Sequence, residues 1–144
     1  MANPVISWYI KEQDNYIQQD EYYLGSFTSD SEINITVQVW NNRYGSKSVD
    51  NITDARLAIY FDTIEDSSLL EYCTISVNDS VYGALETELQ RGIFSIGELS
   101  GNYNDGSEQA PNDINFKNIK IKFSNFPGNL KNGLKNMFLD IEFD

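Results

Sequence analysis

Two acidic segments carry the residues of this sequence that best suit a metal ion. Residues 102–108 read Asn-Tyr-Asn-Asp-Gly-Ser-Glu, and further carboxylates lie between residues 62 and 66. Ca²⁺ prefers several oxygen ligands from flexible loops, and both segments would supply them if they met at one end of the fold. The candidate ligands are Asp62, Asp66, Asn104, Asp105 and Glu108. The spacing is not that of an EF-hand, and solvated turn residues explain both segments equally well.

An aromatic cluster near the N-terminus is suited to stacking or to protein contact. It consists of Trp8, Tyr9, Tyr16, Tyr22 and Tyr23. Flat rings on one face of a sandwich stack on sugars in many carbohydrate-binding modules, and aromatic residues are also enriched at protein interfaces. The alternative is that Trp8 and some of the tyrosines fill the core.

Lysines gather in the last part of the chain. Lys120 and Lys122 alternate with apolar residues, so they point outward if the apolar residues point inward. Outward lysines often protect the edge of a sheet against unwanted pairing. The functional alternative is that they dock onto an acidic partner together with Lys117, Lys131 and Lys135.

Catalytic signatures are missing from the composition. The 144 residues include no histidine, so Ser-His-Asp and Cys-His catalysis and His-ligated zinc are excluded. Cys73 is the only cysteine, and no intrachain disulfide is possible. Two carboxylates suffice for glycoside hydrolysis, but nothing marks one pair among 22 acidic residues. We therefore expect no enzymatic activity and no cofactor.

The charge is acidic and unevenly distributed. The net charge is −12; residues 1–113 carry −14 and residues 114–144 carry +2. Such a chain repels nucleic acid and anionic lipid, so we expect neither as a partner. No apolar run approaches the ~20 residues that span a bilayer. The first residues lack the features of a signal peptide, so we expect synthesis in the cytoplasm.

Short strands must position these residues. Residues 33–40 alternate Ile33, Ile35, Val37 and Val39 with small polar residues, which predicts a strand with one buried face. The polar positions, including Gln38, would suit a face packed on another subunit. Similar alternation predicts strands over residues 5–10, 22–27, 55–61, 72–77, 93–99, 119–123 and 139–143.

The segments between these strands complete the prediction. In residues 82–91 the spacing of Leu85 and Leu89, with Gly92 following, favours a short helix. Residues 11–20, 62–68 and 101–113 read as connections, and Cys73 lies on the apolar face of its strand, where it would be inert. We therefore predict one all-β domain over residues 1–144, an antiparallel β-sandwich of seven to nine strands with at most that one helix.

Two runs of residues resemble a known family. The run Ile33-x-Ile35-x-Val37-x-Val39-Trp40-Asn41-Asn42, followed by Ala55-x-Leu57-x-Ile59-Tyr60-Phe61, resembles the B and C strands of immunoglobulin-like sandwiches. Phe126-Pro127-Gly128 and Met137-Phe138-Leu139-x-Ile141-x-Phe143 resemble the last hairpin, although the paired core cysteines of antibody domains are absent. The chain is similar to immunoglobulin-like accessory proteins of tailed bacteriophages, which decorate capsids or tails. The resemblance implies an immunoglobulin-like or C2-like sandwich and a place in a virion, and it assigns no site residue.

Three functions follow from these features. The first is a non-catalytic structural or interaction protein, a phage virion accessory or assembly component that forms homo-oligomers or docks on other subunits. Its interaction candidates are Trp8, Tyr9, Tyr22, Tyr23, Lys120 and Lys122. The second is a carbohydrate-binding module, assisted by calcium or not. The third is an acidic inhibitor that mimics nucleic acid.

Overall fold

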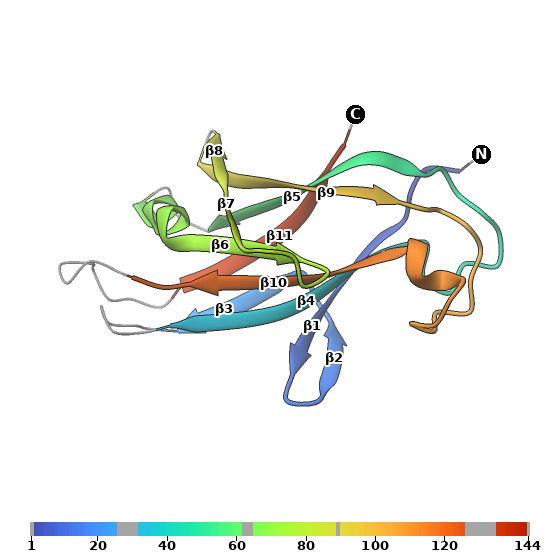
Figure 1. Cartoon of the computed structure of the whole chain (residues 1–144), viewed down its shortest axis with the longest axis horizontal. Helices are drawn as coiled ribbons and strands as arrows, with labels where there is room; N and C mark the ends of the chain where they lie inside the picture. The colour runs from blue at the N-terminus through green and yellow to red at the C-terminus, as the bar shows by residue number, and fades with distance from the viewer. Residues whose placement is uncertain (1, 26–31, 62–64, 89, 126–134, 144) are drawn as a thin grey trace.

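The protein is all-β, with two antiparallel sheets packed against each other (Figure 1). A computed structural model describes residues 2–25, 32–61, 65–88, 90–125 and 135–143. The predicted antiparallel β-sandwich is confirmed. Eight of its strands have five residues or more, within the predicted range, and three shorter strands extend the sheets among the described residues.

The first sheet has six strands in the order β2-β1-β4-β10-β6-β7. Its bounds are β1 (Ile6–Glu12), β2 (Asn15–Gln18), β4 (Ile33–Asn41), β6 (Cys73–Val77), β7 (Gly83–Ala84) and β10 (Phe116–Phe123). The predicted connection over residues 11–20 is instead half of a β-hairpin, because β2 pairs with β1 around a turn at residues 13–14.

The second sheet has five strands in the order β3-β11-β5-β9-β8. Its bounds are β3 (Glu21–Gly25), β5 (Ile52–Phe61), β8 (Glu86–Glu88), β9 (Arg91–Leu99) and β11 (Lys135–Glu142). Two 3-10 helices, η1 (Glu65–Tyr72) and η2 (Asn112–Ile114), lie at opposite ends of the sandwich (Figure 1).

The long strands alternate between the two sheets along the chain. From β3 onward each strand of five residues or more lies in the sheet opposite its predecessor. Consequently β10 pairs with β4 and β6, whereas β11 pairs with β3 and β5. The closing hairpin implied by the resemblance is therefore wrong for the described strands, and the turn at residues 126–128 lies outside the described residues.

The core lies between the sheets and follows the predicted alternation. Strand β5 directs Leu57, Ile59 and Phe61 inward, and β4 directs Ile35, Val37 and Val39 inward. Fully burying each such side chain contributes roughly 1.5–3 kcal/mol, so this layer dominates the stability of the sandwich.

The predicted helix over residues 82–91 is wrong. This segment forms β7 and β8, which pair with β6 and β9 at one edge of each sheet. Leu85 packs on Gly92, where a Cβ atom would lie 2.7 Å from the Leu85 Cδ1 atom. Gly92 thus provides space for a leucine and does not end a helix. Pairing with two sheet edges outweighs the local helical spacing.

Candidate interaction surfaces

Aromatic side chains lie together on the outer face of the second sheet. Leu57, Ile59 and Phe61 point inward, so the intervening Tyr60 points outward, and Phe138 is its direct partner on β11. The two rings stack with centroids 5.4 Å apart and an interplanar angle of 18°. Tyr60 is 39% exposed.

Tyr23 extends this surface onto the edge strand β3. It pairs with Asn136, two residues before Phe138, so it lies diagonally next to the stacked pair. Its side chain is 55% exposed. We call Tyr23, Tyr60 and Phe138 the aromatic face. Tyr60 and Phe138 were not among the predicted interaction residues, because only the pairing of β5 with β11 brings them together.

Carboxylates border the aromatic face. Glu21 is the partner of Phe138 on β3, and Asp140 lies outward on β11. Partial burial raises the pKa of the Tyr60 hydroxyl, and the charges of Asp140 and Asp20 raise it further. Asp140 and Asp20 therefore lie close enough to Tyr60 for their charges to act on its hydroxyl. We call Asp20, Glu21 and Asp140 the acidic rim.

An ion pair borders the same surface on its other side. Arg91 donates to both carboxylate oxygens of Glu142, with Nη2 2.9 Å from Oε1. These hydrogen bonds lower the pKa of the Glu142 carboxyl. On β5, Ile59 pairs with Gly92, the residue after Arg91, and Arg56 pairs with Glu142. The ion pair therefore passes over β5 near Ala58. Ala58 points outward yet is only 1% exposed, which agrees with a cover of this kind.

Lysines occupy part of the outer face of the first sheet. Lys120 and Lys122 alternate with the buried Ile119, Ile121 and Phe123, so they point outward as predicted. Lys11 points to the same side from β1, because it follows the buried Ile10. We call Lys11, Lys120 and Lys122 the lysine face.

The lysine face does not protect a sheet edge. Strand β10 is an interior strand with β4 on one side and β6 on the other, so the edge-guarding interpretation is wrong. Lys117 lies in register with Val39 and therefore on the other side of β10. Lys131 lies outside the described residues, and of Lys135 the structure describes only the backbone.

Lys120 and Lys122 each have a partner within the chain. The Lys120 Nζ atom lies 2.7 Å from Asp79 Oδ1, and this hydrogen bond raises the pKa of the lysine. The Lys122 Nζ atom lies 4.7 Å from the centroid of the Tyr82 ring. Both contacts are at the surface, where such interactions contribute little and exchange easily.

The other part of this outer face is covered by loops of the chain itself. Gln38 is 1% exposed; it accepts a hydrogen bond from the Trp40 indole and donates to Glu108 at 2.8 Å and to Asn118 at 2.9 Å. The expectation that Gln38 would face another subunit is therefore wrong. Trp40 also stacks on Phe116, with centroids 4.5 Å apart.

Arg43 packs over the aromatic rings of this covered part of the face. Its guanidinium carbon lies 4.5 Å from the Tyr9 ring centroid, 4.6 Å from that of Trp40 and 5.0 Å from that of Tyr44. Its Nε atom donates to the Gly106 carbonyl at 3.1 Å. Tyr9 is thus half-buried under an arginine and unavailable as a stacking platform.

The loop over residues 101–113 uses its polar groups within the protein. The side-chain Oδ1 atom of Asn104 accepts from the backbone N–H groups of Tyr44 and Gly106, both at 3.0 Å. The Asp105 carboxylate accepts from the Ser107 N–H and the Asn112 amide, and these bonds lower the pKa of Asp105. Two of the candidate calcium ligands therefore shape the loop.

The described parts of the two acidic segments do not meet. Helix η1 lies at one end of the sandwich, and the loop over residues 101–113 lies at the other (Figure 1). Asp62 lies outside the described residues, and of Asp66 the structure describes only the backbone. Within the described ranges, no group of three acidic or cysteine side chains is placed to hold a metal ion.

The predicted N-terminal aromatic cluster is divided among three environments. Trp8 is 5% exposed and belongs to the core, which bears out the core-filling alternative for this residue. Tyr22 packs against the core, and Tyr9 and Tyr16 lie half-buried on the outer face of the first sheet. Only Tyr23 is well exposed.

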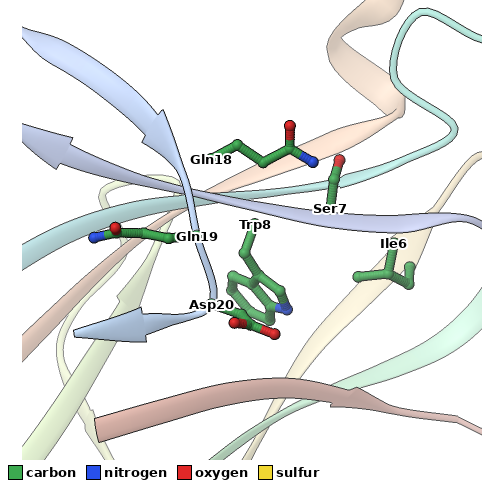
Figure 2. Close-up of a pocket in the computed structure, with 6 residues that line it drawn as sticks. All are labelled: Ile6, Ser7, Trp8, Gln18, Gln19 and Asp20. Carbon is green, nitrogen blue, oxygen red and sulfur yellow. The ribbon is translucent and has the colours of Figure 1, made fainter. Parts of the chain in front are cut away.

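A pocket of about 240 Å³ lies beside Trp8, where the chain crosses from β2 to β3. Figure 2 shows the indole of Trp8 on the opposite side of β1 from Ser7, with Asp20 beside the ring. Since the ring is almost fully buried, it forms a wall and does not offer a face on which a sugar could stack.

Cys73 has no role at a surface. It is buried, and desolvation raises the pKa of its thiol to about 12. The predicted inert position is confirmed.

Comparison with known proteins assigns no family, because no protein-family model and no curated protein matches the chain. No helix in the described part of the chain is long and apolar enough to cross a membrane.

Proposed function

We propose that this protein is a non-catalytic structural protein that self-associates through the aromatic face of its second sheet. The observation that carries the proposal is the stacked pair of Tyr60 and Phe138, which lies next to the exposed Tyr23 with no described segment covering it. Aromatic residues supply much of the binding energy at protein interfaces, where they form the centre of the contact.

The size of this surface fits the centre of a larger interface. A stable contact buries roughly 800 Å² on each partner, more than three partly exposed rings provide. The acidic rim and the ion pair of Arg91 with Glu142 would supply the polar surroundings that such contacts usually have. Together with the resemblance to phage accessory proteins, these features favour a virion accessory or assembly component.

Carbohydrate binding is the second candidate, because exposed rings on a flat sheet face also suit pyranose stacking. Tyr23 and Tyr60 are the residues that would stack. A glycan array with and without calcium tests this function, and silence under both conditions would remove it.

The geometry favours self-association over mimicry of nucleic acid. A mimic needs a continuous row of carboxylates. Here Asp79 pairs with Lys120 on one sheet and Glu142 pairs with Arg91 on the other, so cations are interspersed on both outer faces.

Sedimentation velocity over a range of protein concentrations tests the proposal. The wild type should associate, and Tyr60→Ser/Phe138→Ser should remain monomeric while keeping its circular dichroism spectrum. Tyr103→Ser is the matched control, because Tyr103 is 70% exposed on a distant loop. A wild type that is monomeric at every concentration, at low and high salt, would contradict self-association.

A further inference from the structure

Resting on this proposed function, we infer that the aromatic face of one copy docks on the lysine face of the next copy. The two faces lie on opposite sides of the sandwich, because one belongs to the outer side of the second sheet and the other to the outer side of the first. The contact is therefore heterologous, with each copy offering a different surface on either side.

Charge decides between this arrangement and a two-fold dimer. The aromatic face is bordered by Asp20, Glu21 and Asp140. A two-fold contact through this face would bring two acidic rims together, and juxtaposed like charges disfavour association. The lysine face offers the opposite charge from Lys11 and Lys120.

The lysine face also offers groups that suit aromatic rings. Lys122 already lies over the ring of Tyr82, so its ammonium group is placed for cation–π contact. The alkyl stems of lysines cover apolar surface while their charged ends stay solvated. Tyr16 lies half-buried nearby, and the charge of Lys120 opposes the rise in its pKa that burial and Glu108 cause.

The partners that these lysines have within the chain do not prevent docking. The pair of Lys120 with Asp79 is largely exposed, with the two side chains 50% and 78% accessible. Exposed pairs contribute little to stability, so Lys120 can exchange Asp79 for a carboxylate of the neighbouring copy.

The net charge of −12 opposes any association between copies. This repulsion acts over the whole molecule and is largely screened at physiological salt, where the Debye length is about 8 Å. Charge contacts within the interface are shorter than that length and persist. A heterologous contact between opposite sides forms either a ring or an open filament.

Mixing two variants tests the inference. Lys122→Glu disables the lysine face and leaves the aromatic face intact, whereas Tyr60→Ser/Phe138→Ser does the reverse. Each variant alone should associate at least about tenfold more weakly than the wild type. Mixed at a concentration where neither associates alone, they should form a discrete one-to-one complex, because only one pair of intact faces remains.

Two further variants make the test specific. Lys47→Glu changes the net charge by the same amount as Lys122→Glu but lies on an exposed loop, so it should associate like the wild type. Asp140→Lys reverses a charge of the acidic rim without removing a ring, and it should associate more weakly than the wild type.

The outcomes separate the two proposals. If Lys122→Glu associates as strongly as the wild type, the lysine face is not the partner and this inference fails, whereas self-association through the aromatic face stands. If the wild type never associates, the proposed function fails first. If the mixture of variants stays monomeric although both are folded, the heterologous contact is refuted.

Discussion

Replacing Gln38 by methionine should destabilise the fold by breaking a buried polar network. The side chain of Gln38 accepts from the Trp40 indole N–H and donates to Glu108 and Asn118. Methionine has a similar length but offers no comparable acceptor or donor. The change therefore removes three hydrogen bonds while nearly preserving the packing volume.

The magnitude follows from the burial of each partner. Trp40 is 0% exposed, so its N–H would have no access to water, which costs about 1–3 kcal/mol. Glu108 and Asn118 are exposed and can bind water instead, so each loss contributes about 0–1 kcal/mol. Together these terms give a destabilisation of about 1–5 kcal/mol.

Equilibrium urea unfolding of a double-mutant cycle measures the effect. Trp40→Phe removes the buried donor, so Gln38→Met should cost about 1–2 kcal/mol less in that background than in the wild type. Thr36→Val is the matched control, because Thr36 lies half-buried two residues away on the same face of β4. It should change stability by less than about 0.5 kcal/mol.

One result would refute the reasoning. If Gln38→Met costs no more than Thr36→Val, the indole N–H is not isolated from water and the loops over Gln38 do not cover it. If the cycle shows no coupling, the loss arises elsewhere and the bond from Trp40 contributes nothing. A domain of this size should lose about 3 °C in Tm for each kcal/mol, so a thermal scan checks the same numbers.

Three further predictions concern other parts of the fold. Gly101→Ala should lower the free energy of unfolding by about 2 kcal/mol or more, because its Cβ atom would lie 2.2 Å from the backbone oxygen of Val49. At Gly97 an added Cβ meets no atom, so Gly97→Ala should lower it only by the left-handed strain of about 1 kcal/mol at a φ of +86°. Urea unfolding of the two variants compares these values. The Cys73 thiol is buried and its pKa is raised to about 12, so at pH 8 it should react with iodoacetamide only as fast as the protein unfolds. Mass spectrometry follows the labelling, and rapid labelling of the native protein would contradict the burial of this thiol. The pKa of Glu142 is lowered in the folded state, so its contribution to stability is present above the unfolded pKa and is lost as pH falls through the folded pKa. Glu142→Gln should therefore flatten the loss of stability that accompanies acidification below the usual pKa of a glutamate. A series of urea titrations measures this loss, and an unchanged slope would show that the arginine contact is unimportant.

The long strands could be predicted because their signal is local. Over most of β4, β5 and β10 every second residue is apolar, and a strand directs alternate side chains to opposite faces. The same rule placed Cys73 inward and Lys120 and Lys122 outward without any knowledge of neighbouring strands.

The local signal failed where the neighbours decide the conformation. Residues 82–91 have helical spacing, but they form strands because β6 and β9 each need a partner at that edge. Lys120 was interpreted as an edge residue because the alternation within one strand does not reveal how many strands lie beside it. Gln38 was expected to be exposed, yet a loop 70 residues further along the chain covers it.

By itself, the sequence determined the fold class, the inward and outward sides of the long strands, and the absence of histidine-based catalysis. Only the tertiary structure decided which outward residues meet. Tyr60 and Phe138 are far apart in the chain and stack because β11 lies beside β5, while the alternation of strands between sheets places the lysines of β10 on the opposite side. The physical reason is that the side of a strand that faces the core is set by the alternation of residues along that strand, whereas the pairing of strands is set by the packing of the whole chain.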